Sequence, residues 1–273
     1  MSEDETVVLV FSSVVGLFCW VWWYGSSLTA RSSLVAGRTS ARGVLLVMPL
    51  LSALILLIIL KLWSASDVRD DGRYLTMYFL LGAGWCGVAS FIPAWLGISF
   101  RQDVLTRANH AASWVTTGWI LAVTLSFAGA NIGDGPGWWV VVFSAMLSTG
   151  MLTLVYFLWE KLAATNDAVT IDRDLATGLR MLGLFVGCGA VFGISAAGDW
   201  QSADATVRDF FLRAWPAVLI FLVAWIFHAL LRPSPEAPRP SVLTAGIIPM
   251  ILLLAMGLGW WAFVGSHVIG EAA

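Results

Sequence analysis

Eight long apolar runs, separated by short polar or charged stretches, divide the chain. Each run is about 20 residues long, the length an α-helix needs to cross a hydrocarbon layer roughly 30 Å thick. Inside lipid only helices and closed barrels satisfy every backbone polar group, and these runs are too long for barrel strands. The pattern predicts an all-α, polytopic integral membrane protein. Its helices are expected at about 6–24, 43–63, 74–99, 109–129, 137–160, 174–197, 207–231 and 241–263.

The middle of this pattern occurs twice. Asn109 opens one apolar run, and Asp174 opens another 65 residues later. At the same spacing, Gly133-Asp134 falls on Gly198-Asp199, and a further apolar run follows each Gly-Asp pair. The sequence therefore predicts two tandem helical hairpins that run in the same direction.

This duplication divides a single membrane domain into four segments: an N-terminal three-helix segment (1–106), a first hairpin repeat (107–163), a second (164–231), and a proline-rich linker with the last helix (232–273). The linker is too rich in proline to be helical and is expected to be extended. Thr244-Ala245-Gly246 faintly resembles the openings of the two repeats, which leaves a third, half-length repeat open.

Composition agrees with a membrane protein. Apolar residues make up 59% of the chain and charged residues 12%, against about 25% charged in soluble domains. A net charge of −2 without a basic cluster excludes nucleic acid as an expected partner. Cys19, Cys86 and Cys188 stand singly in apolar runs, which is typical of buried side chains rather than of a disulfide or metal site.

Basic residues predict the orientation, because Lys and Arg are retained on the cytoplasmic side. Across eight spans, one set of loops holds nine basic residues and the other holds three. The first set is Arg31, Arg38, Arg42, Arg101, Arg107, Lys161, Arg173, Arg232 and Arg239; the second is Arg69, Arg73 and Arg208. Both termini are therefore expected outside, with the proline-rich linker in the cytoplasm.

The repeated elements carry a family resemblance. The openings Asn109-His-Ala-Ala and Asp174-Leu-Ala-Thr-Gly, the central glycines Gly118 and Gly183, and the two Gly-Asp turns resemble the YjfL-type family of bacterial inner-membrane proteins. The resemblance covers the last five predicted helices and implies tandem two-helix repeats and the bacterial inner membrane. It also implies association with PspA-like membrane-stress proteins and ATP-grasp amide ligases of the glutathionylspermidine synthetase type. The family is a domain of unknown function and supplies no catalytic residues.

Asp134 and Asp199 occupy equivalent predicted turns. As a pair of carboxylates at the mouth of a pseudo-symmetric site they would serve an ion or ligand pathway. The simpler interpretation, which we favour, is turn chemistry: glycine supplies a positive φ and Asp accepts hydrogen bonds from the following amides.

Two arginines lie within predicted spans. Arg180 is near the cytoplasmic end and Arg213 near the outer end, and each can extend to its nearest interface, which is the simpler reading. If either faces the bundle interior, it becomes a candidate for binding an anion or a headgroup. Asp209 lies one turn before Arg213, a spacing that allows the two to pair. The hypothesis is that they line an outer-facing polar cleft between the repeats. Thr206-x-x-Asp209 has the form of a capping box.

Helix caps and glycines have structural explanations. Asn109 and Asp174 are favoured N-cap residues. Glycines allow neighbouring helices to approach closely. We expect one such seam between the repeats, formed by Gly118, Gly183, Gly187, Gly189 and Gly193. Pro216 and Pro249 would each free a backbone carbonyl and bend their helices.

No metal, cofactor or enzymatic motif is predicted. His110 and His228 both lie near cytoplasmic helix ends, but nothing in their spacing requires the rings to converge on a metal or haem. Among the motifs sought, HExxH, GxSxG, the Walker loop and the dinucleotide-binding fingerprint are missing from the sequence.

Three functions remain open, with the lipid bilayer as the certain surrounding and a homo-oligomer left open. The first is a channel or transporter for an ion or small polar solute, favoured by a water-accessible cavity lined by Asp199, Asp209 or Arg213. The second is a non-catalytic scaffold in envelope-stress maintenance that recruits a cytoplasmic partner, favoured by a dry, packed core. The third, a membrane-embedded enzyme, ranks last. Transport would gain support if one space were shared by the polar side chains of Thr117, Thr124, Ser126, Ser144, Ser148 and Ser195.

Overall fold

The computed structural model describes residues 1–30, 40–233 and 241–271. It is 84% helical, with a single isolated bridge between Ser64 and Gly133 in the described part. Eight helices in these ranges are long and apolar enough to cross a membrane, which confirms the predicted all-α polytopic fold. The linker at 234–240, which contains Arg239, lies outside the described residues, as do Arg31 and Arg38.

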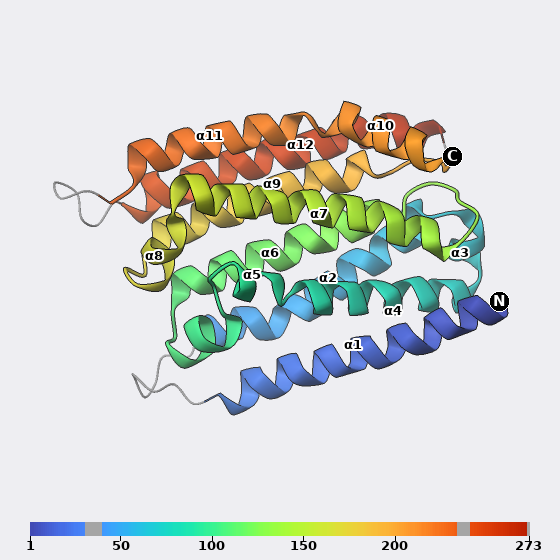
Figure 1. The fold of residues 1–273 in the computed structure, drawn as a ribbon, viewed down its shortest axis with the longest axis horizontal. Helices are drawn as coiled ribbons and strands as arrows, with labels where there is room; N and C mark the ends of the chain where they lie inside the picture. Colours follow the sequence, from blue (N-terminus) through green and yellow to red (C-terminus); the bar gives the residue numbers. More distant parts are fainter. Residues whose placement is uncertain (31–39, 234–240, 272–273) are drawn as a thin grey trace.

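The helices run back and forth along one axis (Figure 1). In chain order they are α1 (Glu3–Thr29), α2 (Ser40–Trp63), α3 (Ser66–Asp70), α4 (Gly72–Ala89), α5 (Ile92–Trp95), the π-helical η1 (Phe100–Thr106), α6 (His110–Gly129), α7 (Trp138–Ala163), α8 (Thr165–Thr170), α9 (Leu175–Ser195), α10 (Ala203–Ala214), α11 (Pro216–Leu231), the π-helical η2 (Leu243–Ile247) and α12 (Ile248–Glu271). The start of α1 and the end of α12 lie at the same end of the bundle (Figure 1).

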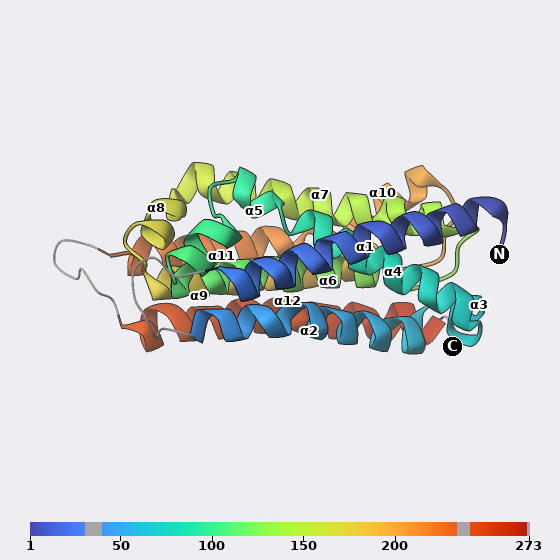
Figure 2. The same cartoon turned by 90° about the horizontal axis from the view of Figure 1, so that it is seen from below.

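Helix α9 forms the centre of the bundle. It packs against α6 on one side and α12 on the other, while α7, α10 and α11 cover it further. Nearly every residue of α9 is buried, whereas only about a fifth of the residues in the spans of α1 and α12 are buried. Figure 2 shows α1 running along the outside of the bundle. In a membrane protein such exposed apolar faces contact lipid.

The α6–α9 seam depends on glycine. A Cβ at Gly118 would lie 2.6 Å from the Cα of Leu182, and a Cβ at Gly189 would lie 2.5 Å from the Cα of Ala122. Since the nearest atoms are backbone, no side-chain rotation makes room. The contact positions rise together in both helices, so α6 and α9 are parallel, as predicted for 109–129 and 174–197.

A second seam joins α9 to α12. A Cβ at Gly183 would lie 2.9 Å from the Cα of Met250, and one at Gly187 would lie 2.7 Å from the carbonyl oxygen of Leu253. The prediction of one glycine seam between the hairpins is therefore wrong for Gly183 and Gly187, which face α12. Gly189 and Gly193 face α6, because i and i+4 glycines share a face while the two pairs lie on opposite sides of the helix.

The two seams use corresponding residues. If each α6 residue is moved forward by 65 positions and each α9 residue by 68, the contacts of the first seam become contacts of the second. The pairs are Gly118–Leu182 with Gly183–Met250, Ala111–Gly178 with Ala176–Gly246, and Ala122–Gly189 with Gly187–Gly257.

Two predicted helices differ from the structure. The helix expected at 74–99 ends at Ala89, and Pro93 lies in the first turn of α5, where its missing N–H costs no helical hydrogen bond. The helix expected at 207–231 begins at Ala203, capped by the hydroxyl of Ser202 rather than by a capping box at Thr206. It is interrupted at Trp215 because Pro216 cannot donate to the preceding turn.

Candidate functional site

A cavity of about 320 Å³ lies where both hairpins turn, at the end of the bundle that carries the termini. It is lined by the α6–α7 connection, the α9–α10 connection and the first turns of α10, together with parts of α1, α3 and α4. Four of the five residues predicted for a ligand or ion pathway line it: Asp134, Asp199, Asp209 and Arg213. The fifth, Arg180, does not.

The two turning loops pair with each other through their backbones. The N–H of Gly198 donates to the carbonyl of Ile132 and that of Trp200 to the carbonyl of Asp134, each at 2.8 Å. Gly133 has φ +106° and a Cβ there would lie 2.5 Å from the carbonyl carbon of Gly198, which itself has φ +126°. Glycine is required at both positions, and the paired loops form one wall of the cavity.

Asp199 has a structural partner. Its Oδ1 accepts a hydrogen bond from the backbone N–H of Asp134 at 2.8 Å, so the bond crosses from one hairpin to the other. The predicted turn chemistry, in which each Asp serves the amides that follow it, is therefore wrong for Asp199. The carboxylate of Asp134 forms no hydrogen bond or ion pair with the described residues and is exposed.

The predicted pair of Asp209 with Arg213 is not formed. Arg213 donates from Nη1 to the carbonyl of Ala197 at 2.7 Å, while Asp209 accepts from Nε of Arg208 at 3.4 Å. Carbonyls at a helix C-terminus attract cations, and Ala197 follows the last turn of α9. The backbone of Arg213 is also fixed, because its carbonyl oxygen accepts a hydrogen bond from the indole N–H of Trp260 at 3.1 Å. Arg213 therefore faces the bundle interior and stabilises the loop beside the cavity.

Several residues that line the cavity were not predicted from the sequence. Glu5, Asp67, Tyr74 and Tyr78 come from the N-terminal three-helix segment, and no local motif marks them. Only the topology, which brings the start of α1 and the α2–α4 connection to the hairpin turns, could have found them. Glu5 accepts from the Tyr74 hydroxyl at 3.1 Å, which joins α1 to α4 at this end.

The polar side chains of the spans do not share one space. Ser144 and Ser195 line the cavity. Thr124 donates to Ser52 at 2.9 Å, away from the cavity, and Ser148 donates to the carbonyl of Ser126 at 3.3 Å. The polar space therefore ends near Ser144.

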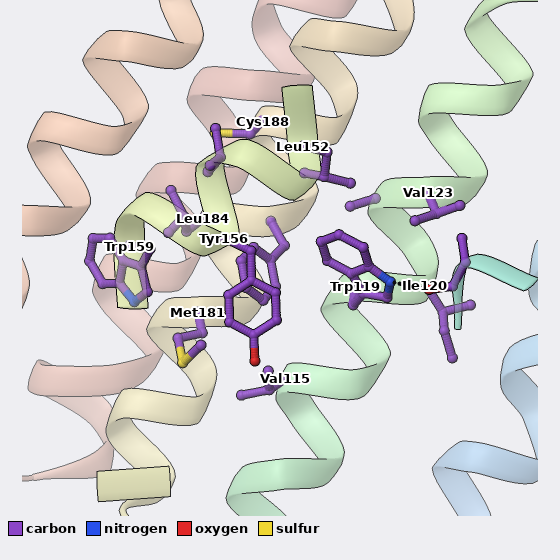
Figure 3. Close-up of a cluster of buried hydrophobic side chains, with 14 of the residues drawn as sticks. Val115, Trp119, Ile120, Val123, Leu152, Tyr156, Trp159, Met181, Leu184 and Cys188 are labelled. Carbon is purple, nitrogen blue, oxygen red and sulfur yellow. Dashed lines mark hydrogen bonds between the residues drawn. The ribbon is translucent and has the colours of Figure 1, made fainter. Parts of the chain in front are cut away.

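The middle of the bundle is packed with aromatic side chains (Figure 3). The rings of Trp119, Tyr156 and Phe185 contact one another with centroids 4.8 to 5.7 Å apart, and all three are fully buried. The indole N–H of Trp119 donates to the carbonyl of Ala89 at 2.8 Å. This cluster separates the cavity from the opposite end.

At that opposite end Arg180 is buried, with 1% of its surface exposed. The prediction that it extends to the interface is wrong. Its Nη1 donates to the carbonyl of Ala245 and its Nη2 to the hydroxyl of Thr177 at 2.7 Å. Pro249 lacks the N–H that would otherwise bond Ala245, four residues earlier. Arg180 thus donates to a carbonyl to which Pro249 cannot donate.

Asn109 and Asp174 are the N-caps of α6 and α9. Asn109 accepts from the amides of Ala111 and Ala112, and its own Nδ2 donates to the carbonyl of Val169 at 2.7 Å. Asp174 accepts from the amides of residues 176 and 177 and lies 3.9 Å from the guanidinium of Arg180. These partners give both residues a structural role.

Metal ligands do not converge in the described part of the chain, where no group of three or more His, Cys, Asp or Glu could hold an ion. His228 packs with its ring against Trp159, the two centroids 5.8 Å apart.

Comparisons of the chain with protein-family models, curated proteins and solved structures give no match.

Proposed function

We propose that this multi-pass membrane protein binds a small polar solute in the cavity at the hairpin turns and carries it across the bilayer. The observation that carries the proposal is the convergence of Asp134, Asp199, Asp209 and Arg213 on one cavity of about 320 Å³. Ligand pockets have volumes of roughly 300–1,000 Å³. Ionisable groups within membrane spans commonly mark a solute pathway, and Asp209 and Arg213 lie within the candidate span Ala203–Leu231.

The repeated packing supports a carrier rather than an open pore. We propose that α6–α7 and α9–α11 are tandem repeats and that α12 begins a third, since both seams of α9 use corresponding residues. Carriers built from repeats expose their site alternately when one repeat moves against another. The aromatic cluster around Trp119 closes the middle here, so a carrier must open it by moving α9 relative to α6 or α12.

Cysteine accessibility tests the proposal. Thr117 lies on α6 beyond Trp119 as seen from the cavity; it is buried and its hydroxyl forms no hydrogen bond. The variant Thr117→Cys, with the three native cysteines replaced by Ala, is treated with a membrane-impermeant thiol reagent in vesicles of both orientations. A carrier exposes this position to the side opposite the cavity in part of its cycle, so slow modification from that side alone is expected.

A scaffold is the second candidate, and the packed aromatic middle favours it. In a scaffold the bundle has no need to open, so Thr117→Cys would stay unmodified from either side under all conditions. That result would reject transport and leave recruitment of a cytoplasmic partner, such as the PspA-like or ATP-grasp proteins of the resembled family, as the proposal to pursue.

A further inference from the structure

The cavity is lined by more negative than positive groups. Carboxylates come from Glu5, Asp67, Asp134, Asp199 and Asp209, and the only basic side chain among the described lining residues is Arg213. The N-terminal ammonium lies 4.0 Å from Glu5 and offsets part of that charge. A cavity walled by apolar helices concentrates this field, because low-dielectric walls focus field lines.

Three of the five carboxylates already have partners inside the protein. Glu5 accepts from the amide of Ser2 and from Tyr74, Asp67 accepts from the amide of Val68, and Asp199 accepts from the amide of Asp134. Asp134 forms no such bond, and Asp209 contacts only the side chain of Arg208, which is 71% exposed. Asp134 and Asp209 are the carboxylates left for a ligand.

Ser144 points to a ligand independently of these charges. It lies on α7 with 4% of its surface exposed, it lines the cavity, and its hydroxyl forms no hydrogen bond with the described residues. Ser195, also on the lining, instead donates to the carbonyl of Val191 at 2.7 Å. Its hydroxyl is open to the cavity, so a water or solute molecule bound there supplies its hydrogen bond.

The lining suits an organic cation better than a metal ion. The carboxylates do not gather into a set that could hold a metal, and the volume accommodates a molecule of several non-hydrogen atoms. Tyr74, Tyr78 and Trp200 add aromatic rings to the wall, and cations bind favourably over such rings.

We propose that the cavity selects a small organic cation of the ammonium type, held by Asp134, Asp209 and the hydroxyl of Ser144. This inference rests on the proposed solute-binding function and specifies the class of its substrate.

The experiment uses Ser195→Cys in the full-length protein, which leaves Asp134, Asp209 and Ser144 in place, with the native cysteines replaced by Ala. Its modification rates are measured with a neutral methanethiosulfonate, a trimethylammonium-bearing one and a sulfonate-bearing one, each divided by the rate with free mercaptoethanol. We expect the cationic reagent to be favoured over the anionic one by about tenfold, in line with electrostatic focusing. Replacing Asp134 and Asp209 together by Asn should bring the ratio close to one. Tetramethylammonium chloride should slow the neutral reagent, and sodium methanesulfonate at the same ionic strength should not.

Two further variants make the result decisive. Ser148→Cys lies one turn deeper on α7, is fully buried and does not line the cavity, so it should react with none of the reagents. Ser144→Cys, on the lining from α7, replaces Ser195→Cys if that variant does not fold. Reaction with the neutral reagent but no cationic preference or protection would overturn the cation inference and leave the solute site intact. Failure of both lining cysteines to react with any reagent would overturn the cavity itself and the proposed function with it.

Discussion

Arg180 shows how a charged residue within a membrane span can serve the backbone rather than a ligand. Its guanidinium bonds the carbonyl of Ala245, which lies four residues before Pro249 and cannot receive an α-helical hydrogen bond from it, because proline has no N–H. An unsatisfied buried carbonyl costs about 1–3 kcal/mol, so Arg180→Met should destabilise the protein by roughly that amount. In a Pro249→Ala background the restored amide can bond Ala245, and Arg180→Met should then cost less.

The measurement is a double-mutant cycle on the free energy of unfolding in detergent. Additive effects of the two substitutions would contradict this account of Arg180.

Asp199 is expected to stabilise the protein as a hydrogen-bond acceptor for the amide of Asp134, and not through its negative charge. Asp199→Asn keeps an oxygen that can accept from the amide of Asp134, whereas Asp199→Ala leaves that amide without its partner. Thermal unfolding should separate the two variants, with Asn close to the parent and Ala lower by about 1 kcal/mol. An equal loss in both would show that the charge of Asp199 matters to stability.

Single residues were predictable where their chemistry is local. The caps Asn109 and Asp174 follow from residue type and position, since an N-cap is satisfied by amides two and three residues away. The backbone groups that pair with the side chains of Arg180, Arg213 and Asp199 lie 16 to 65 residues away in sequence. No local pattern specifies such partners, and for that reason the expected Asp209–Arg213 pair failed.

At the scale of elements, the glycine seams determine how closely the helices approach. Gly189→Ala would place a Cβ 2.5 Å from the Cα of Ala122, and the backbone must move to relieve that contact. Overpacking of this kind costs about 1–3 kcal/mol. Gly150→Ala is the matched control, because it is also helical and a Cβ there meets nothing within 4 Å.

The comparison is made by thermal unfolding. Gly189→Ala should lower the transition temperature by several degrees and Gly150→Ala should leave it unchanged or raise it, since alanine is the better helix former. Equal behaviour of the two would argue against close packing of α6 on α9.

The helices themselves were predictable because a span needs a long apolar run. Their breaks were harder to place. The apolar run continues through Pro216, so hydropathy alone extends one helix where the structure has α10 and α11. Glycine spacing indicated close packing on α9, but α9 has two glycine-bearing faces and the sequence alone did not separate them.

At the scale of the whole molecule, the start of α1 and the end of α12 lie at the same end of the bundle (Figure 1). The distribution of Lys and Arg predicts that this end faces outside. Alkaline phosphatase fused to either terminus should therefore be active, and a green fluorescent protein fused there through the general secretion route should be dark. If the phosphatase fusions were inactive and the green fluorescent protein fusions were fluorescent at both ends, the cavity would lie on the cytoplasmic side instead.

The cavity was predictable only in part. Its hairpin residues follow from the duplicated Gly-Asp turns, which must meet if the repeats lie side by side. The contributions of α1, α3 and α4 depend on how the N-terminal helices pack around the two hairpins, and the pattern of apolar runs carries no information about that arrangement.

The correspondence between the two seams of α9 has a consequence for how the chain can be assembled. If α12 packs on α9 through contacts that correspond to those between α9 and α6, the last helix should be able to bind the rest of the bundle without a covalent connection. A gene severed between α11 and α12 should still yield a working protein when both fragments are made in one cell, and the pair should co-purify. Replacing Gly257 on the smaller fragment by a bulky residue should abolish association of the two fragments.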